Sequence, residues 1–247
     1  MVFNIINYIN SLPLDVKIIN VSYKKLTYIP DLSRFTTLQS LHCNNNNLTQ
    51  LPNLPKSLQY LACQCNRLTT IPKLPKNLQT LLCYNNQLTL LPELNDKLQS
   101  LDCHGNLLTQ LPELNENLQL LYCATNKLTF LPKLNEKLQS LYCGSNLLTQ
   151  LPELNSMLLV LYCHNNRLTT LPNLNTFLQT LNCQYNQLTL LPSLNDNLEI
   201  VNCRHNLLTY LPQLNDKLLY IEYSDNLLAY PLDKVITGEK ASFKLVY

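Results

Sequence analysis

The chain has 247 residues, of which 46% are hydrophobic and 14% are charged, and its formal net charge is +2. This balance excludes an intrinsically disordered polyelectrolyte and a strongly basic nucleic-acid-binding protein. Only 3 glycines are present, and they form neither a GxGxxG nor a GxxxxGK[ST] phosphate-binding loop. Leucine and asparagine, with 61 and 33 residues, are in large excess.

Residues 1–15 predict a short N-terminal capping helix with Val2, Ile5, Ile6 and Ile9 facing inward. The segment has no basic residues ahead of an apolar stretch, as a signal peptide would have. No apolar run approaches the roughly eighteen residues that cross a bilayer. We therefore expect an intracellular protein of a host or cell cytoplasm, without a signal peptide, a transmembrane segment or a membrane partner.

Residues 16–232 consist of a twenty-residue repeat with the consensus LxxLxCxxNxLTxLPxLxxx. Apolar residues alternate around the cysteine, as in Leu41 and Cys43, which predicts a short strand with one buried face. One such unit cannot bury its own apolar face, so we expect parallel units to stack. An irregular first unit and a last unit with Tyr223 in place of cysteine bring the number of predicted strands to about eleven. Residues 233–247 predict a C-terminal cap, with a strand at 242–247.

The repeat resembles the leucine-rich repeat (LRR). Its second half, seen in Leu51 to Leu58 and Ile71 to Leu78, is similar to the short LPxLP-type units of bacterial type III effectors. The bias toward Asn, Ile, Lys and Tyr resembles LRR proteins of giant, mimivirus-like DNA viruses. The resemblance implies a β-rich solenoid, a right-handed curved rod of about eleven repeats. It also implies a parallel β-sheet on the concave face and extended, polyproline-like convex segments.

Two columns of repeated residues are assigned structural roles. The asparagine amide at the turn after each strand is expected to bond backbone groups of its own coil and of the adjacent coil. The remaining asparagines are interpreted in part as a compositional bias. The cysteines are expected to act as small buried hydrophobic residues. The column members are Asn46, Asn66, Asn86, Asn106, Asn126, Asn146, Asn166, Asn186, Asn206 and Asn226, and Cys43, Cys63, Cys83, Cys103, Cys123, Cys143, Cys163, Cys183 and Cys203.

Metal, redox and catalytic interpretations of these cysteines are disfavoured by their spacing. Zinc sites use clustered CxxC-like pairs, and parallel neighbours in a column point the same way, which is poor disulfide geometry. Histidines adjacent to a column cysteine point to the opposite face of the strand, so they form no Cys–His pair. Cys65 lies off the column, and either an exposed reactive thiol or simple drift in a loop explains it. We expect no cofactor, no metal and no enzymatic activity.

The residues that alternate with the buried columns define the concave face, whose central row includes Ala62. Three consecutive repeats place a tyrosine on that row, and tyrosine is enriched at interface hot spots. The candidate partner-binding residues are Tyr84, Asp102, His104, Tyr122, Tyr142, Tyr162, His164 and Arg204.

Three functions remain open for this chain. The first is a non-enzymatic module that binds an unidentified protein through the concave face. The second is a structural or assembly component without a dedicated partner, in which stacked tyrosines only stabilise neighbouring strands. The third is an enzyme, for which no catalytic residues are found. Nucleic acid is not expected as a partner because Arg204 is almost the only cation on this face.

Overall fold

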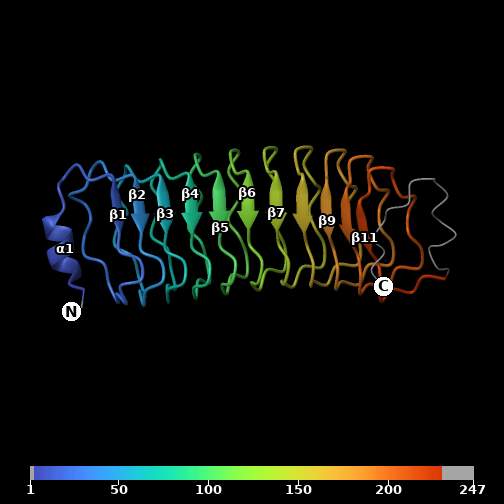
Figure 1. Ribbon diagram of the computed structural model, residues 1–247, viewed down its shortest axis with the longest axis horizontal. Coiled ribbons are helices and arrows are strands. Elements are labelled where there is room, and N and C mark those ends of the chain that lie inside the picture. The colour runs from blue at the N-terminus through green and yellow to red at the C-terminus, as the bar shows by residue number, and fades with distance from the viewer. Residues whose placement is uncertain (1–2, 230–247) are drawn as a thin grey trace. The chain divides into compact units, whose positions relative to one another are not determined.

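The computed structural model describes residues 3–229. The chain divides into two units, residues 1–127 and 128–247. Both consist of successive coils, each with one three-residue strand followed by irregular segments and turns (Figure 1). The parallel β-solenoid with a twenty-residue repeat, predicted from the sequence, is confirmed in each unit. The strand at 242–247 and the rest of the expected C-terminal cap lie outside the described residues.

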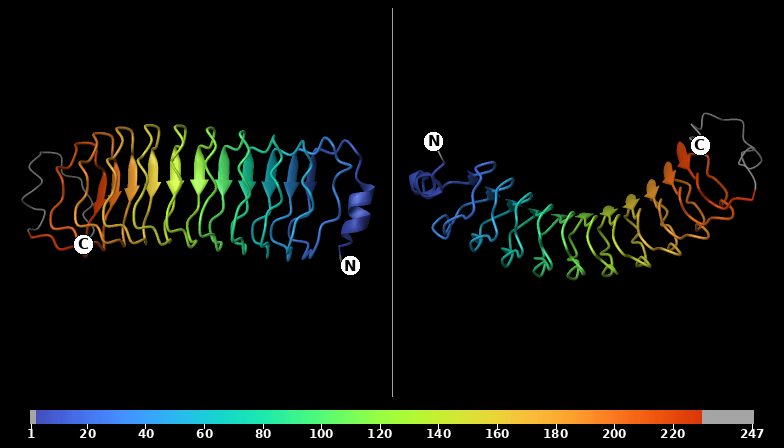
Figure 2. Two further views of the ribbon diagram at one scale, coloured as in Figure 1. Left: turned by 180° about the vertical axis from the view of Figure 1, so that it is seen from behind. Right: turned by 90° about the horizontal axis from the view of Figure 1, so that it is seen from below.

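Residues 3–127 of the N-terminal unit contain one helix and six strands, and each of the first five strands pairs in parallel register with the next along the chain. These elements are α1 (Ile5–Ser11), β1 (Ile18–Asn20), β2 (Ser40–His42), β3 (Tyr60–Ala62), β4 (Thr80–Leu82), β5 (Ser100–Asp102) and β6 (Leu120–Tyr122). Within this unit the strands share one side of the coils and the loops the other (Figure 2).

Residues 128–229 of the C-terminal unit contain five strands that pair in the same way. They are β7 (Ser140–Tyr142), β8 (Val160–Tyr162), β9 (Thr180–Asn182), β10 (Ile200–Asn202) and β11 (Tyr220–Glu222). In this unit the strands lie on the inner side of the bend that the coils describe (Figure 2, right).

The middle residue of every strand points into the core. The column cysteine is the first residue after the strand. Leu41 and Cys43 are both fully buried, and the N–H of Cys43 donates to the carbonyl of Ala62 in the next coil at 2.8 Å. The cysteine therefore continues both the apolar column and the backbone ladder beyond the strand. All nine column cysteines are buried and free.

Helix α1 covers the first coil with one apolar face. Its N-cap Asn4 accepts the N–H of Asn7 at 3.0 Å, and Ile5 and Ile9 are buried. The expectation that Ile6 also faces inward is wrong, because its side chain is 40% exposed. Residues four apart share a helix face whereas the next residue is rotated by about 100°. Val2 lies outside the described residues. Among residues 3–229 no helix is long and apolar enough to cross a bilayer.

Within each unit the asparagine column joins a coil to the one before it. The amide nitrogen of Asn66 donates to the carbonyls of Cys63 and Cys43, both at 3.0 Å. Its oxygen accepts the N–H of Leu48 at 2.9 Å. The same three bonds recur at Asn86, Asn106 and Asn126, and at Asn166, Asn186 and Asn206. One side chain thus satisfies backbone groups of two coils.

A second asparagine ladder runs along the loop side and was not predicted from the sequence. The amide nitrogen of Asn175 donates to the carbonyl of Asn155 at 2.8 Å and to that of Leu158 at 3.0 Å. Equivalent bonds are made by Asn195 and Asn215. The twenty-residue recurrence of these asparagines carried the signal, so part of the asparagine excess that we interpreted as compositional bias is structural.

The second ladder begins only where the sequence changes from proline to asparagine. The first two regular coils carry Pro55 and Pro75 at this position, and proline has no side-chain donor. In the first of them the hydroxyl of Ser57 donates to the carbonyl of Leu38 at 2.7 Å. This is the carbonyl, seventeen residues back, that an asparagine at position 55 would have bonded.

We predict that Asn106→Ala lowers the free energy of unfolding by about 1–3 kcal/mol, because it leaves buried backbone groups without partners. Asn106 is 6% exposed and makes all three ladder bonds. Urea unfolding followed by circular dichroism measures the change. The matched control is Asn53→Ala at an exposed loop position, where we expect a change within about 0.5 kcal/mol. Equal effects of the two substitutions would contradict a ladder that stabilises the fold.

Candidate functional site

A left-handed backbone residue follows each strand and begins the turn. One residue in each later coil has a φ between 51° and 63°, including Asn45, Cys65 and Gly105, and the first coil has two, Tyr23 and Lys25. The residue just before it, such as His104 or Arg204, keeps the strand alternation and lies on the same side as the exposed strand residues. We call this surface the strand face of each unit. It consists of the first and third strand residues and the residue two places after the strand.

On the strand face of the N-terminal unit, Asp102, His104 and Tyr84 form one cluster. The Nδ1 of His104 lies 2.7 Å from a carboxylate oxygen of Asp102. The imidazole stacks on the ring of Tyr84, with the ring centroids 4.5 Å apart and the planes 11° apart. Both the hydrogen bond and the stack therefore hold the orientation of His104.

On the strand face of the C-terminal unit, Tyr142, Tyr162 and His164 form a second cluster. The two tyrosine rings stack at a centroid distance of 4.9 Å, and His164 meets the ring of Tyr162 edge-on at 6.4 Å. A Cβ atom at Gly144 would lie 2.3 Å from the His164 ring, so only glycine accommodates this placement. Burial lowers the pKa of His164, and its buried Nδ1 has no hydrogen-bond partner among the described residues.

Arg204 lies on the strand face of the same unit, at the end of β10. Its Nε donates to the Gln184 side-chain oxygen at 2.8 Å and its Nη2 to the Tyr185 hydroxyl at 3.1 Å. Tyr185 in turn stacks on His205 at 4.3 Å, and Nε2 of His205 lies 3.1 Å from a carboxylate oxygen of Asp225. A chain of side-chain contacts thus runs through three consecutive coils and holds the guanidinium.

The repeat pattern alone did not predict a role for Tyr185, His205 and Asp225, because their position in the repeat is a turn rather than a strand. The feature that could have indicated them is their twenty-residue spacing, since all three occupy the turn position at which the backbone has a positive φ. Gly144 was also missed as a partner of His164. Neither feature follows from alternation along one strand, since both depend on contacts between neighbouring coils.

The structure assigns Tyr122 to the N-terminal unit and shows that the assignment of Ala62 to the exposed row is wrong. Tyr122 ends β6, in the unit that precedes the one containing Tyr142 and Tyr162. Ala62, assigned to the exposed central row, is only 2% exposed. Its register partners on the adjacent strands, His42 and Leu82, carry larger side chains, and Gln64 on the same coil is also buried, with 9% exposed.

The column thiols are held in their neutral form by burial. Desolvation raises the pKa of Cys43 and of Cys143 to about 12. The same cause raises the pKa of Cys63, Cys83, Cys163 and Cys183 well above the ordinary value. A neutral, buried thiol is neither a nucleophile nor a metal ligand. Within residues 3–229 no group of three or more His, Cys, Asp or Glu side chains is arranged to hold a metal ion.

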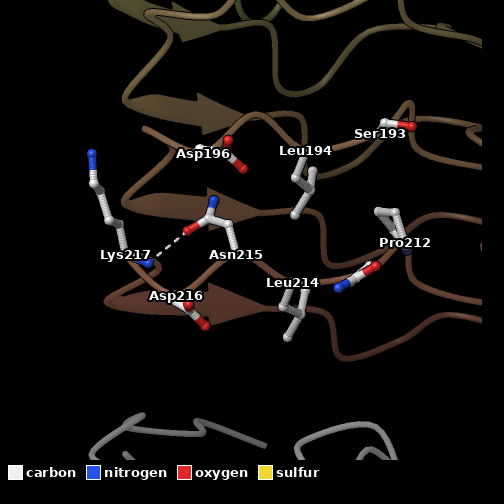
Figure 3. Close-up of a pocket in the computed structure, with 9 residues that line it drawn as sticks. Ser193, Leu194, Asp196, Pro212, Leu214, Asn215, Asp216 and Lys217 are labelled. Atoms are coloured by element: carbon white, nitrogen blue, oxygen red, sulfur yellow. Dashed lines mark hydrogen bonds between the residues drawn. The ribbon is translucent and has the colours of Figure 1, made fainter. Parts of the chain in front are cut away.

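A shallow groove on the loop side of the C-terminal unit is shown in Figure 3. It has a volume of about 520 Å³ and is lined by two successive coils, with Ser193, Asp196, Gln213 and Asp216 among its residues. The Asn215 oxygen there accepts the backbone N–H of Lys217 at 2.8 Å. The polar groups belong to the second asparagine ladder and to a solvated surface, so the groove has no convergent chemistry.

Comparison with solved structures identifies the repeats. The chain is similar to YopM, a leucine-rich effector protein from Yersinia pestis, with 35% identity and a TM-score of 0.82 over 86% of this chain and 62% of that chain. It is similar to the functional domain of InlJ from Listeria monocytogenes, which includes a cysteine ladder. That match has 26% identity and a TM-score of 0.60 over 84% of this chain and 53% of that one.

The Drosophila Toll–Spatzle complex shows the same fold at 22% identity, with a TM-score of 0.63 over 87% of this chain and 39% of that chain. This chain therefore spans less than two thirds of the length of each of these structures. No protein-family model and no curated protein matches the sequence. The chain has the leucine-rich repeat fold, and effector proteins of bacteria are among the structures that share it.

We predict that a polar thiol reagent labels at most one cysteine in the native protein and ten in the denatured protein. Nine cysteines are buried, and Cys65 has intermediate exposure. Mass spectrometry after a short exposure to iodoacetamide identifies the labelled position. The control Cys65→Ser removes the native label. Fast labelling of several cysteines in the native protein would show that the column is open to solvent.

We predict that the column thiols cause a loss of stability at alkaline pH. In the unfolded chain a thiol ionises above its ordinary pKa of 9.0, whereas Cys143 in the folded protein remains protonated up to about 12. Between these values the unfolded chain binds fewer protons, so the free energy of unfolding falls by up to about 1.4 kcal/mol per pH unit per thiol. Well below pH 9.0 the thiol is protonated in both the folded and the unfolded chain, so its burial causes no loss of stability there.

Urea-unfolding midpoints measured from pH 7 to pH 11 test this dependence. The variant Cys143→Ala has one buried thiol fewer and is expected to show a shallower decline than the wild-type protein. Identical slopes for the two proteins would mean that the buried thiols do not cause the alkaline destabilisation.

Proposed function

We propose that this leucine-rich repeat solenoid is a non-enzymatic module that binds a protein partner through its strand face. The observation that carries the proposal is a cluster of aromatic and imidazole rings on the strand face of each unit. Tyr84 stacks with His104 in the first unit, and Tyr142 stacks with Tyr162 in the second. Rings held in place by their neighbours lose little conformational entropy on binding, which is why tyrosine is frequent at interface hot spots.

The similar structures support a protein partner. The Toll structure was solved as a complex with Spatzle, and YopM is described as an effector protein. Stacked solenoid coils also present an extended, rigid inner surface, which repeat proteins commonly use for binding. We propose by the same comparison that the protein acts inside a cell. From its amino-acid bias we further propose a kinship with the LRR proteins of giant DNA viruses.

The alternative proposal is a structural or assembly component without a dedicated partner. Stacked tyrosines on neighbouring parallel strands stabilise a sheet by about 0.2–1 kcal/mol per pair even without a ligand. The Tyr142–Tyr162 stack alone is compatible with that role. The arrangement around His164 favours binding, because Gly144 leaves the imidazole half-buried with an unsatisfied nitrogen, which costs stability.

We predict that replacing Tyr122, Tyr142 and Tyr162 together with alanine abolishes capture of the partner. Affinity purification from the native cellular context, followed by quantitative mass spectrometry, compares the variant with the wild type. The matched control replaces Tyr28, Phe130 and Tyr210, three aromatic residues that lie off the strand face and are 49%, 49% and 58% exposed. This control is expected to retain the partner.

Two results would contradict the proposal. A partner retained by the strand-face variant and lost by the control variant would place the interface on another surface. A reproducible enzymatic turnover that disappears in Cys65→Ser would show that the chain is not a pure binding module. Both variants are first checked for an unchanged circular dichroism spectrum.

A further inference from the structure

Among residues 3–229, Arg204 is the only lysine or arginine on the strand face of either unit. Arginine side chains at a protein surface are ordinarily mobile or paired with a carboxylate. Within the described part of the chain, Arg204 makes no ion pair with an acidic side chain. Arg204 is therefore able to bind an anionic group of another molecule.

The guanidinium of Arg204 is nevertheless held in one orientation. Its Nε is occupied by Gln184 and one hydrogen of Nη2 by the Tyr185 hydroxyl. The group also lies over the ring of Tyr185, with the guanidinium carbon 5.2 Å from the ring centroid. Both hydrogens of Nη1 and the second hydrogen of Nη2 remain, and together they form the end of the fork that binds a carboxylate through two parallel bonds.

The acidic residues nearest in the sequence of coils are already engaged. Glu222 is 8% exposed, and its two oxygens accept the hydroxyls of Tyr220 and Ser224 at 2.8 and 3.0 Å. Asp225 is paired with His205. Both carboxylates are therefore engaged by other side chains, and neither forms an ion pair with Arg204 among the described residues.

Tyr142 and Tyr162 lie on the same strand face of the same unit as Arg204. From β8 to β10 there are two strand spacings, and Arg204 lies two residues further along its strand. The separation is about 12 Å, because strands are about 4.8 Å apart and residues about 3.3 Å apart. An extended chain covers that distance in three or four residues.

We propose that the strand face of the C-terminal unit recognises an extended peptide segment of a protein partner by two points of contact. An aromatic or branched aliphatic side chain packs on the Tyr142–Tyr162 stack, and an Asp or Glu carboxylate three or four residues away binds Arg204 end-on. This inference rests on the proposed function and gives its partner a chemistry. A carboxylate fits better than a phosphate, since a dianion would meet a single cation and two acidic neighbours, Glu222 and Asp225.

The test begins with a phage-displayed library of random twelve-residue peptides selected on the full chain. We expect enrichment of sequences with an apolar residue followed or preceded at three or four places by Asp or Glu. The dissociation constant of one enriched synthetic peptide is then measured by fluorescence anisotropy. With Arg204→Gln it should rise about ten- to a hundredfold, as expected for loss of a charge-assisted bidentate bond.

Three comparisons separate recognition from a change in folding. Changing the peptide's acid to Asn or Gln should weaken binding to the wild-type protein and leave binding to Arg204→Gln unchanged. Arg204→Lys, which keeps the charge without the fork, should bind with intermediate affinity. Arg167→Gln removes an arginine from an exposed turn of the same unit and should bind like the wild type.

Each other outcome has a defined meaning. Three outcomes would overturn the two-point inference. They are an enrichment of peptides that lack an acid at this spacing, equal affinities of a peptide for the wild type and Arg204→Gln, and no enrichment at all. Tighter binding of the same peptide with phosphoserine in place of the acid would also overturn it. If binding is lost in Tyr142→Ala with Tyr162→Ala but does not depend on the acid, only this inference fails. If neither those tyrosine substitutions nor Arg204→Gln weakens binding, the proposed strand-face function fails as well.

Discussion

The structure depends on one constraint, which is that a twenty-residue coil cannot satisfy its own backbone. Three-residue strands leave most N–H and C=O groups without partners inside the coil. Backbone bonds between neighbouring coils pair part of them, and the asparagine column supplies partners for others. The amide of Asn66, for example, donates to the carbonyls of Cys63 and Cys43 and accepts the N–H of Leu48. The second ladder on the loop side does the same for the return segment. Stability therefore comes from neighbours.

Because the core and the asparagine column hold the coils together, the residues of the strand face can vary from coil to coil. Leucine, cysteine and asparagine occupy the positions that fill the core and join the coils, so most residues that alternate with them are at least partly exposed, with Ala62, Gln64 and Glu222 among the buried exceptions. Tyr142, Tyr162 and His164 illustrate how neighbouring coils then build a surface together, with Gly144 making room for the imidazole. Arg204 shows the same principle, since its orientation is imposed by Gln184 and Tyr185 from the preceding coil.

The sequence was most informative where one residue type recurs at a fixed period. The positions of the strands and the burial of Leu41 and Cys43 follow from the alternation of apolar residues and the need to stack. It was less informative where the outcome depends on side-chain size. Ala62 alternates correctly yet is buried, and its register partners on the adjacent strands, His42 and Leu82, have larger side chains. Ile6 lies in an apolar helix yet is exposed because the helix buries one stripe. The loop-side ladder was not predicted because part of the asparagine excess was interpreted as a compositional bias.

The sequence by itself determined the solenoid, the number of strands and the columns that fill the core, because a strict period allows each unit only one way to bury its apolar face. Only the tertiary structure decided which exposed side chains act together. Residues twenty positions apart become neighbours through strand pairing, and their contacts depend on ring orientation and on space left by small residues. The stack of Tyr185 on His205 and the hold on Arg204 are contacts of this kind. These contacts between coils cannot be predicted from the sequence of a single repeat.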